Sequence, residues 1–250
     1  MAPGRGGDGA GRVALPPAEL NVWRQAVARD WRALEHAPAA LRADRRLVAE
    51  GLRRDYRAMQ FASEALRADR GFALEAVRVD GRALGFCATT VQYDREVMLE
   101  TVKGCGMMLS LLNPLLRQGR LLRQDKEVVL EAVRSDWRAL EFADGAMQGD
   151  RDVALAAVTT GWEAIRFVPE DLRADQALLA AALAQSGEAL RYAREAARAE
   201  PGLRARAAAG GWAVAAEGQE RIVHCDAGKP PADVSPTSGG TPPELEGFIR

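Results

Sequence analysis

Histidine and cysteine, which most often serve as catalytic bases, nucleophiles and metal ligands, are scarce in this chain of 250 residues. The histidines are His36 and His224, and the cysteines, Cys87, Cys105 and Cys225, form no CxxC pair. Nucleophilic catalysis needs a base beside the nucleophile, and a zinc site needs several clustered ligands. His224 and Cys225 are adjacent, so a catalytic or redox role is considered only there. The sequence otherwise predicts no enzyme, no metal and no cofactor.

The carboxylates are numerous, but they recur at regular intervals along the chain. An active site is needed once, so this recurrence favours a structural role. The chain contains no P-loop and no dinucleotide fingerprint. Its 34 basic and 35 acidic residues nearly balance, whereas a general nucleic-acid binder usually has a basic excess.

One recurring pattern of aromatic and basic residues has the composition of a binding surface. An aromatic residue or glycine recurs at one position of a repeating unit, and arginine often follows it. The candidate partner-binding residues in this pattern are Trp31, Arg32, Tyr56, Arg57, Arg82, Trp137, Arg138 and Trp162. Tryptophan and arginine are favoured in protein-binding hot spots, and the same alternation could stack single-stranded RNA. Alternatively, the rings are packing that fills space left by units with glycine at this position.

These residues belong to a repeat of 25 residues, counted from an acidic residue that opens each unit. The eight units begin at Glu19, Asp44, Asp69, Asp94, Asp125, Asp150, Asp175 and Glu200. Each step is 25 residues except the fourth, which is 31. The six extra residues resemble a local duplication, because Leu115-Leu116-Arg117-Gln118 is followed closely by Leu121-Leu122-Arg123-Gln124. A register kept over so many steps indicates stacked structural repeats.

The first part of each unit has the pattern of an amphipathic helix. Positions three and eight after the acidic residue are apolar in every unit, and position seven is nearly always small. The apolar arc spans about 200° of the helix, which suits a helix packed between its counterparts in neighbouring units. The acidic residue itself is expected to cap the helix N-terminus, so the helix is expected to run from about one to ten residues after it. Acid–base pairs three residues apart would support the exposed side: Glu50–Arg53, Glu75–Arg78, Glu100–Lys103 and Glu131–Arg134.

A second, shorter helix is expected in each unit. In half of the units it opens after a second aspartate: Asp30, Asp55, Asp80 and Asp136. An Ala-Leu pair and then an aromatic residue supply its apolar side, and a turn with one buried apolar residue follows. Helices this short are not stable alone in water, so neighbouring units must hold them.

The sequence therefore predicts an all-α solenoid of about seven 25-residue helix-turn-helix repeats plus a degenerate C-terminal capping repeat. The array is expected to span residues 18–226, between disordered tails at 1–17 and 227–250. The last unit is eroded, since Arg204 and Glu217 replace apolar residues. Such polar substitution is typical of a capping repeat.

The recurring strings, such as DRRLVAEGLRRDYRAMQFASEALRA from Asp44 and DKEVVLEAVRSDWRALEFADGAMQG from Asp125, resemble an uncharacterised family, domain of unknown function 4116. The resemblance covers roughly residues 19–200. It rests on the opening Asp–basic–x–aliphatic motif and on the Ala-Leu-x-Phe-Ala block. Residues 103–109 depart most from the pattern. The resemblance implies a helical repeat array with no established activity and transfers no functional residues.

Together these observations predict a non-enzymatic repeat scaffold that binds a protein or peptide. The alternative is a helical repeat protein that binds single-stranded RNA through the aromatic and arginine residues. Because no apolar run approaches about 18 residues, no membrane partner is expected. The sparse cysteines indicate a reducing compartment, so an intracellular, cytoplasmic location is expected. The identity of the partner and the oligomeric state stay open.

Overall fold

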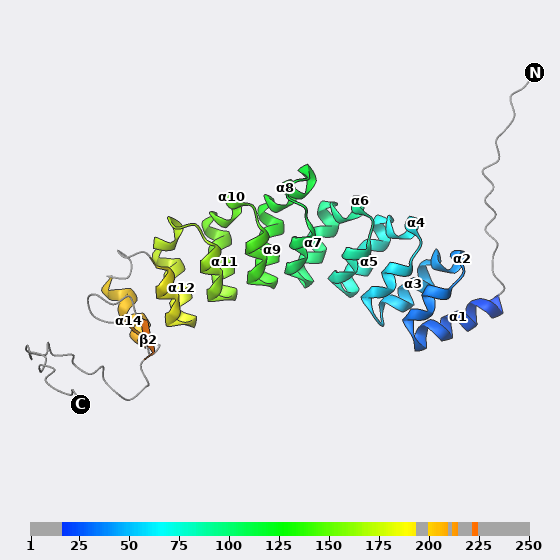
Figure 1. Cartoon of the computed structure of the whole chain (residues 1–250), viewed down its shortest axis with the longest axis horizontal. Helices are drawn as coiled ribbons and strands as arrows, with labels where there is room; N and C mark the ends of the chain where they lie inside the picture. The colour runs from blue at the N-terminus through cyan, green and yellow to red at the C-terminus, as the bar shows by residue number, and fades with distance from the viewer. Residues whose placement is uncertain (1–16, 194–199, 210–211, 215–221, 225–250) are drawn as a thin grey trace, which may run out of the picture.

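The computed structural model describes residues 17–193, 200–209, 212–214 and 222–224. Within these residues, helices stack side by side into one arched array (Figure 1). The predicted tails fall on residues that are not described, apart from Pro17, which begins the first helix. No helix among the described residues combines the length and the apolar character needed to cross a membrane.

Each unit contributes one long α-helix, as the periodicity predicts. These helices are α1 (Pro17–Arg29), α3 (Arg45–Leu52), α5 (Arg70–Val79), α7 (Arg95–Gly104), α9 (Lys126–Ser135), α11 (Arg151–Thr160), α12 (Gln176–Gln185) and α14 (Pro201–Ala209). Consecutive long helices contact each other along the array. The all-α repeat architecture is therefore confirmed.

In the first seven units the second helix is a 3₁₀ helix of six residues. These helices are η1 (Trp31–His36), η2 (Tyr56–Phe61), η3 (Gly81–Phe86), η4 (Gly106–Leu111), η5 (Trp137–Phe142), η6 (Trp162–Phe167) and η8 (Gly187–Tyr192). They form a second layer beside the long helices, so the solenoid has an α layer and a 3₁₀ layer. The tighter 3₁₀ turn suits a segment too short to sustain an α-helix.

The connection between units, expected as a turn, contains a further short helix. These helices are α2 (Ala39–Arg42), α4 (Glu64–Arg67), α6 (Thr89–Gln92), α8 (Arg117–Arg123), α10 (Gly145–Gln148) and η7 (Leu172–Ala174). The labelled α-helices of this group lie along the convex edge of the arch (Figure 1). The next unit's backbone is held there, since the amide of Ser63 donates to the carbonyl of Arg42 and that of Ala88 to Arg67.

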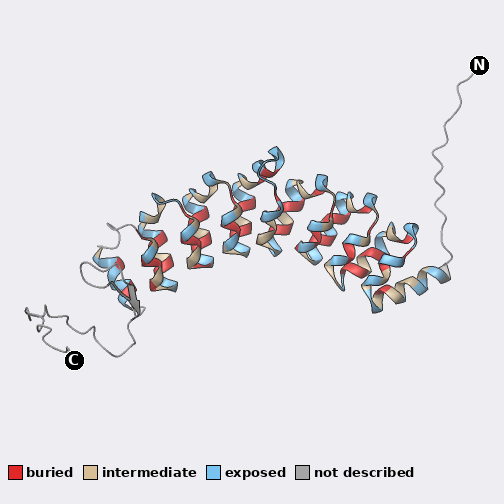
Figure 2. Cartoon of the chain, in the orientation of Figure 1, coloured by how far each residue is buried: buried red, intermediate tan, exposed pale blue. Residues whose placement is uncertain are grey.

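The core runs as a band between the two layers (Figure 2). In the fifth unit, Val128, Val129, Ala132 and Val133 of α9 are buried against Leu140 of η5. The fifth position of the unit, predicted to belong to the same apolar arc, is only half-buried, as at Leu130. It faces out of the α layer, so the helix buries a narrower arc than the sequence suggested.

The predicted caps are present at most units. The capping aspartates at 44, 69, 94, 125, 150 and 175 accept hydrogen bonds from main-chain amides of the first helical turn. The second aspartates at 30, 55, 80 and 136 accept the amide two residues further on and open the 3₁₀ helices. The capping expectation is wrong at Glu19, because α1 begins earlier, at Pro17, and includes it.

A ladder of charges links successive long helices across the surface. A basic residue follows five of the six capping aspartates and reaches the capping aspartate of the next unit, and in several units a second carboxylate as well. The clearest rungs are Arg95 with Asp125 and Glu127, each at 2.6 Å, and Lys126 with Asp150 and Asp152, at 2.9 and 2.8 Å. The cations are about half exposed, so each rung alone contributes little. Together, these ion pairs fix how neighbouring units stack on one another.

Three of the four predicted acid–base pairs form, and one does not. Glu50–Arg53, Glu100–Lys103 and Glu131–Arg134 make ion pairs within their helices. Glu75 instead binds Arg45 of the preceding unit at 2.7 Å, and Arg78 binds Glu100. The reason is Gly71, which stands where the neighbouring rungs carry their second carboxylate. Arg45 therefore takes Glu75 as its partner.

The ladder predicts a stability that falls in acid. The hydrogen bond from Arg151 and the amide of Leu178 lower the pKa of Asp175 below its ordinary 3.8. The pKa values of Asp94, Asp125 and Asp150 are lowered too, although partial burial opposes this. A carboxylate whose pKa is lowered by folding stabilises the folded protein at pH values above its ordinary pKa. This stabilisation is lost as the pH falls through the pKa of the folded state. We expect the melting temperature to drop below about pH 4.

The control for this prediction is Asp175→Asn, because asparagine also caps helices well but carries no charge. Its melting temperature should depend less on pH over the same acid range, measured by circular dichroism. An acid slope as steep as that of the unmodified chain would show that Asp175 contributes nothing to it.

The last unit keeps its long helix, α14, and the described residues that follow it form strands instead of a 3₁₀ helix. Two strands, β1 (Trp212–Val214) and β2 (Ile222–His224), pair antiparallel with Trp212 opposite His224. Among the described residues after α14, no second helix of this unit is present. The Ala-Leu pair that opens the inner face of the other 3₁₀ helices is Val214-Ala215 here, and the aromatic and β-branched residues of β1 and β2 favour strands.

Candidate functional site

The predicted partner-binding residues all lie at the start of 3₁₀ helices. Trp31, Tyr56, Trp137 and Trp162 are half-buried first residues, and Arg32, Arg57, Arg82 and Arg138 are exposed second residues. We call this set the aromatic stripe. It follows the turn from each long helix into its 3₁₀ helix, at the edge opposite the short connecting helices.

Each ring of the aromatic stripe packs against an aromatic residue of the following unit. The ring centroids of Trp31 and Phe61 are 5.8 Å apart, and those of Trp137 and Phe167 are 6.3 Å apart. Tyr56–Phe86 and Trp162–Tyr192 repeat the arrangement at 6.1 and 6.4 Å. The rings therefore connect neighbouring units, and each is partly covered by that contact.

Arginines lie over three of the four rings, those of Trp31, Tyr56 and Trp137. The guanidinium of Arg138 lies 4.7 Å from the Trp137 ring centroid, and that of Arg82 lies 4.2 Å from the Tyr56 ring. The same arginines pair with the capping aspartates, as in Arg82–Asp80 at 2.6 Å. That hydrogen bond lowers the pKa of Asp80. The aromatic stripe is therefore a packed and charge-balanced edge, and its ring faces are poorly placed to stack bases.

Glycines in the same region let neighbouring units approach closely. A Cβ on Gly161 would lie 2.2 Å from the Trp137 ring, and a Cβ on Gly106 would lie 2.1 Å from the carbonyl oxygen of Ala132. The ring position of a unit therefore carries either an aromatic ring that packs on the next unit or, as at Gly106, a glycine that admits the backbone of the next unit, while Gly161 leaves room for the Trp137 ring of the preceding unit. This supports the packing interpretation of the irregular alternation between tryptophan and glycine.

Two units without an aspartate cap are capped by the next unit. Where other units have the second aspartate, the fourth unit has Cys105 and the sixth unit has Gly161. The amide of Gly106 donates to Ser135 Oγ at 3.2 Å, and the amide of Trp162 donates to Gln185 Oε1 at 3.0 Å. Ser135 and Gln185 are the last residues of the long helices that follow, so a missing local cap is replaced across the interface.

The outer side of the α layer carries a groove that the sequence did not predict. Two cavities of about 740 and 270 Å³ lie across α1, α3 and α5 and share Ala49, Arg53 and Glu75. We call them together the α-face groove. Its lining residues are Arg24, Gln25, Ala28, Arg45, Arg46, Ala49, Glu50, Leu52, Arg53, Phe72, Glu75, Ala76, Arg78 and Val79.

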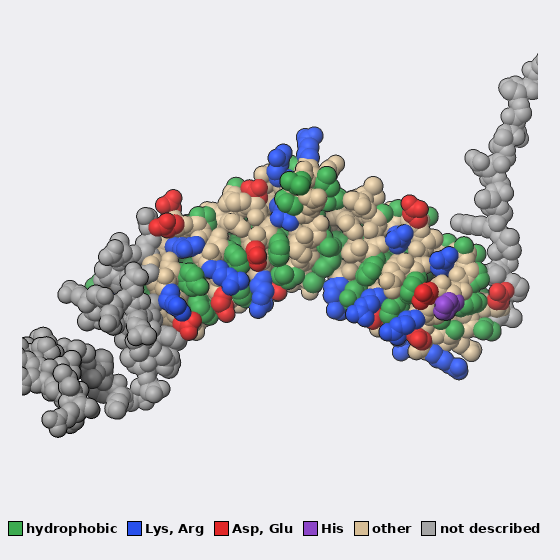
Figure 3. Space-filling model, in the orientation of Figure 1, with side chains coloured by type: hydrophobic (Ala, Val, Ile, Leu, Met, Phe, Trp, Pro, Cys, Tyr) green, Lys and Arg blue, Asp and Glu red, His purple; other side chains and the backbone are tan. Residues whose placement is uncertain are grey.

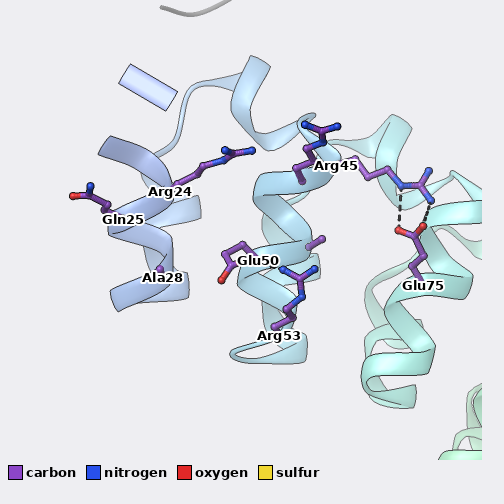
Figure 4. Close-up of a pocket in the computed structure, with 9 residues that line it drawn as sticks. Arg24, Gln25, Ala28, Arg45, Glu50, Arg53 and Glu75 are labelled. Atoms are coloured by element: carbon purple, nitrogen blue, oxygen red, sulfur yellow. Dashed lines mark hydrogen bonds and ion pairs between the residues drawn. The ribbon is translucent and has the colours of Figure 1, made fainter. Parts of the chain in front are cut away.

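The α-face groove has an apolar base and a basic rim. Small or apolar side chains, including Ala49, Ala76 and the 54% exposed Val79, form its base. Five arginines and two glutamates line it. Figure 4 shows Arg45 reaching across to Glu75, so that two of these charges neutralise each other, and Glu50 beside Arg53. Arg24 and Arg46 make no ion pair with the described residues, so the groove keeps an excess of positive charge.

A sequence signal for this groove exists at the fifth position of the unit. That position is leucine in four successive units, Leu74, Leu99, Leu130 and Leu155. It is Arg24 in the first unit and Ala49 in the second. Because two adjacent helices lack a leucine at this position, a groove forms between them. The sequence pattern indicates the groove only once the fifth position is known to face outward.

Chemistry of other kinds finds no support in the described part of the chain. No group of three or more histidine, cysteine, aspartate or glutamate residues could hold a metal ion there. Of the pair His224-Cys225, His224 ends β2 and Cys225 lies outside the described residues. Burial raises the pKa of Cys87 to about 11, so this thiol stays protonated at neutral pH.

Comparison with known proteins identifies the repeats. A family model, Domain of unknown function (DUF4116), matches residues 44–92, 69–117 and 94–148 in three overlapping segments. No curated protein and no solved structure matches the chain. The overlap of the segments follows the 25-residue register of the units at 44, 69 and 94. Residues 44–148 are therefore tandem repeats of the DUF4116 family.

Proposed function

We propose that this helical repeat protein is a non-enzymatic scaffold that binds an acidic segment of a partner protein in the α-face groove. The observation that carries the proposal is the combination of an apolar base with unpaired rim arginines, Arg24 and Arg46, over α1, α3 and α5. A peptide with carboxylates and small apolar side chains would match both features. The free thiols Cys87 and Cys105 fit a cytoplasmic setting.

RNA binding is the second candidate, because basic side chains gather along the concave edge of the arch (Figure 3). The chain carries Arg53, Arg54, Arg57, Arg78 and Arg82 at or near the turns from α3 into η2 and from α5 into η3. Several of these are already paired with carboxylates, such as Arg82 with Asp80 and Arg78 with Glu100. The covered rings also offer little stacking area, so the protein partner is favoured.

The test compares two arginines that occupy the same position in different units. Arg53 lines the α-face groove, whereas Arg134 makes the same pair with a glutamate three residues earlier but lies on α9. We expect Arg53→Glu to weaken binding of a fluorescein-labelled peptide of glutamate and leucine about tenfold, or about 1.4 kcal/mol. Arg134→Glu should leave it unchanged. Fluorescence anisotropy of the full chain measures both.

The same assay with labelled oligouridine separates the two candidates. RNA binding through neutralised phosphates would fall steeply with salt, and it would weaken with Arg138→Ala. The proposal expects neither, and it expects Trp137→Ala to lower the melting temperature without changing peptide affinity. Equal losses from Arg53→Glu and Arg134→Glu, or tight and salt-sensitive oligouridine binding, would contradict the proposal.

A further inference from the structure

The six-residue insertion builds a tip that projects from the convex edge of the arch at α8 (Figure 1). The tip comprises residues 111–123, from the end of η4 to the end of α8. It interrupts an otherwise regular register, and the solenoid does not need it, since the other units connect without it. An element of this kind calls for an explanation other than stacking.

The tip is folded and anchored to the array. Leu112 and Leu122 are buried at 0% and 6% exposure. The amide of Asn113 donates to the hydroxyl oxygen of Tyr93 at 3.3 Å, and the amide of Leu115 donates to Asn113 Oδ1 at 2.9 Å. Gly119 is buried close to the carbonyl of Asn113. The outward side chains of the tip are therefore held in place.

Those outward side chains are leucines. Leu115 is 90% exposed, and Leu111, Leu116 and Leu121 are 37%, 44% and 53% exposed. Four of the six exposed large hydrophobic residues identified in the described chain lie in this one tip. Clustered exposed apolar side chains of this kind mark an interaction surface.

The charged residues of the tip itself are all positive. No aspartate or glutamate occurs between Glu100 and Asp125, whereas Arg117, Arg120 and Arg123 all lie in α8. Arg117 and Arg120 are exposed and make no ion pair within the described residues. In Figure 3, basic side chains (blue) lie at the top of the tip, beside a patch of hydrophobic side chains (green). The occupant of this surface must therefore accept apolar side chains and carry negative charge.

We propose that the tip inserts its leucines into an anionic lipid surface, so that the scaffold associates peripherally with a membrane. The leucines protrude from the array, and a lipid interface can receive protruding side chains without a matching pocket. Leucine is also under-represented among protein hot spots. Arginines beside the leucines would be attracted to anionic headgroups. With so few leucines, binding should be weak, reversible and dependent on lipid composition. The sequence alone, judged by spanning length, predicted no membrane partner.

The experiment is co-sedimentation of the full chain with vesicles of phosphatidylcholine alone or phosphatidylcholine mixed with phosphatidylserine. Binding is expected only to the mixed vesicles. The double variant Leu115→Asp/Leu121→Asp should lose at least about tenfold in apparent affinity, since two apolar contacts are lost and two repelling charges gained. Arg117→Glu/Arg120→Glu should also bind less. The control Val22→Asp alters a 66% exposed residue of α1 and should bind normally.

Circular dichroism melting of every variant accompanies the sedimentation, and the exposed positions should leave the melting temperature unchanged. Three outcomes would overturn the proposal: no binding to the mixed vesicles, equal binding to both vesicle types, or equal binding by the tip variant and the unmodified chain. A tip variant that dissociates an oligomer of the unmodified chain, measured by light scattering without vesicles, would assign the leucines to a second copy instead. Failure of the peptide assay would leave this proposal unaffected, because the α-face groove and the tip share no residues.

Discussion

Gly106→Ala is expected to destabilise the protein by about 3 kcal/mol, the upper end of the usual cost of overpacking. The added methyl group would lie 2.1 Å from the carbonyl oxygen of Ala132 and 3.0 Å from its carbonyl carbon. Both atoms belong to the backbone of α9, so no side-chain rotation relieves the clash. The fourth unit must shift against the fifth, and this also strains the hydrogen bond from Gly106 to Ser135.

Gly104→Ala is the matched control, two residues away. A Cβ at Gly104 meets nothing within 4 Å, and alanine is favoured over glycine in a helix by up to about 1 kcal/mol. Urea unfolding followed by circular dichroism should therefore show a marked loss for Gly106→Ala and no loss for Gly104→Ala. Equal stability of the two variants would mean that η4 and α9 are not packed as described.

Leu140→Ala is expected to cost about 2–5 kcal/mol, the range for truncating a buried leucine. Leu140 is fully buried in η5, where α9 and α11 both pack against that helix. In a linear array each unit is stabilised mainly by its neighbours. A cavity in the middle should therefore weaken the coupling between the two halves, and the unfolding transition should broaden as well as shift.

Hydrogen exchange followed by mass spectrometry locates the effect. In Leu140→Ala, amides of α9, η5 and α11 should lose protection, while those of α3 and α5 should keep theirs. Leu155→Ala is the control, because Leu155 is only half-buried on the outer side of α11 and should cost less. A uniform loss of protection across the whole chain would show a single cooperative core rather than a stacked array.

The long helices could be predicted closely because each unit reports the same periodicity. The predicted span, from one to ten residues after the acidic residue, coincides with α5, α7, α9, α11 and α12. The 3₁₀ character of the second helix could not be predicted, since six residues are too few to distinguish the two helical periods. The strands of the last unit were missed because that unit was interpreted by analogy with the others.

Contacts between units account for most of the differences between the predicted and the observed structure. The charge ladder joins residues 24 to 32 positions apart, so it depends on how the units stack and not on the pattern inside one unit. For this reason the sequence predicts a pair between Glu75 and Arg78, whereas in the structure Glu75 pairs with Arg45. Arg45 takes Glu75 because Gly71 offers it no second carboxylate. The α-face groove was missed for a related reason, because it depends on which side of the long helix faces solvent. The aromatic stripe lies at the start of the 3₁₀ helices, and its packing against the next unit could not be predicted from the pattern inside one unit.

The caps shared across interfaces imply that the repeats are not equally exchangeable modules. The first three units each carry their own aspartate cap, at Asp30, Asp55 and Asp80, so the amides that these residues cap do not depend on the next unit. The sixth unit lacks one, and Gln185 of the seventh also donates to the carbonyls of Val158 and Thr159. Losing the seventh unit by recombination would leave three main-chain groups of the sixth without these partners. Growth or shortening of such a chain by whole repeats is therefore expected to be tolerated best near its N-terminus, whereas units four with five and six with seven are expected to be gained or lost as pairs.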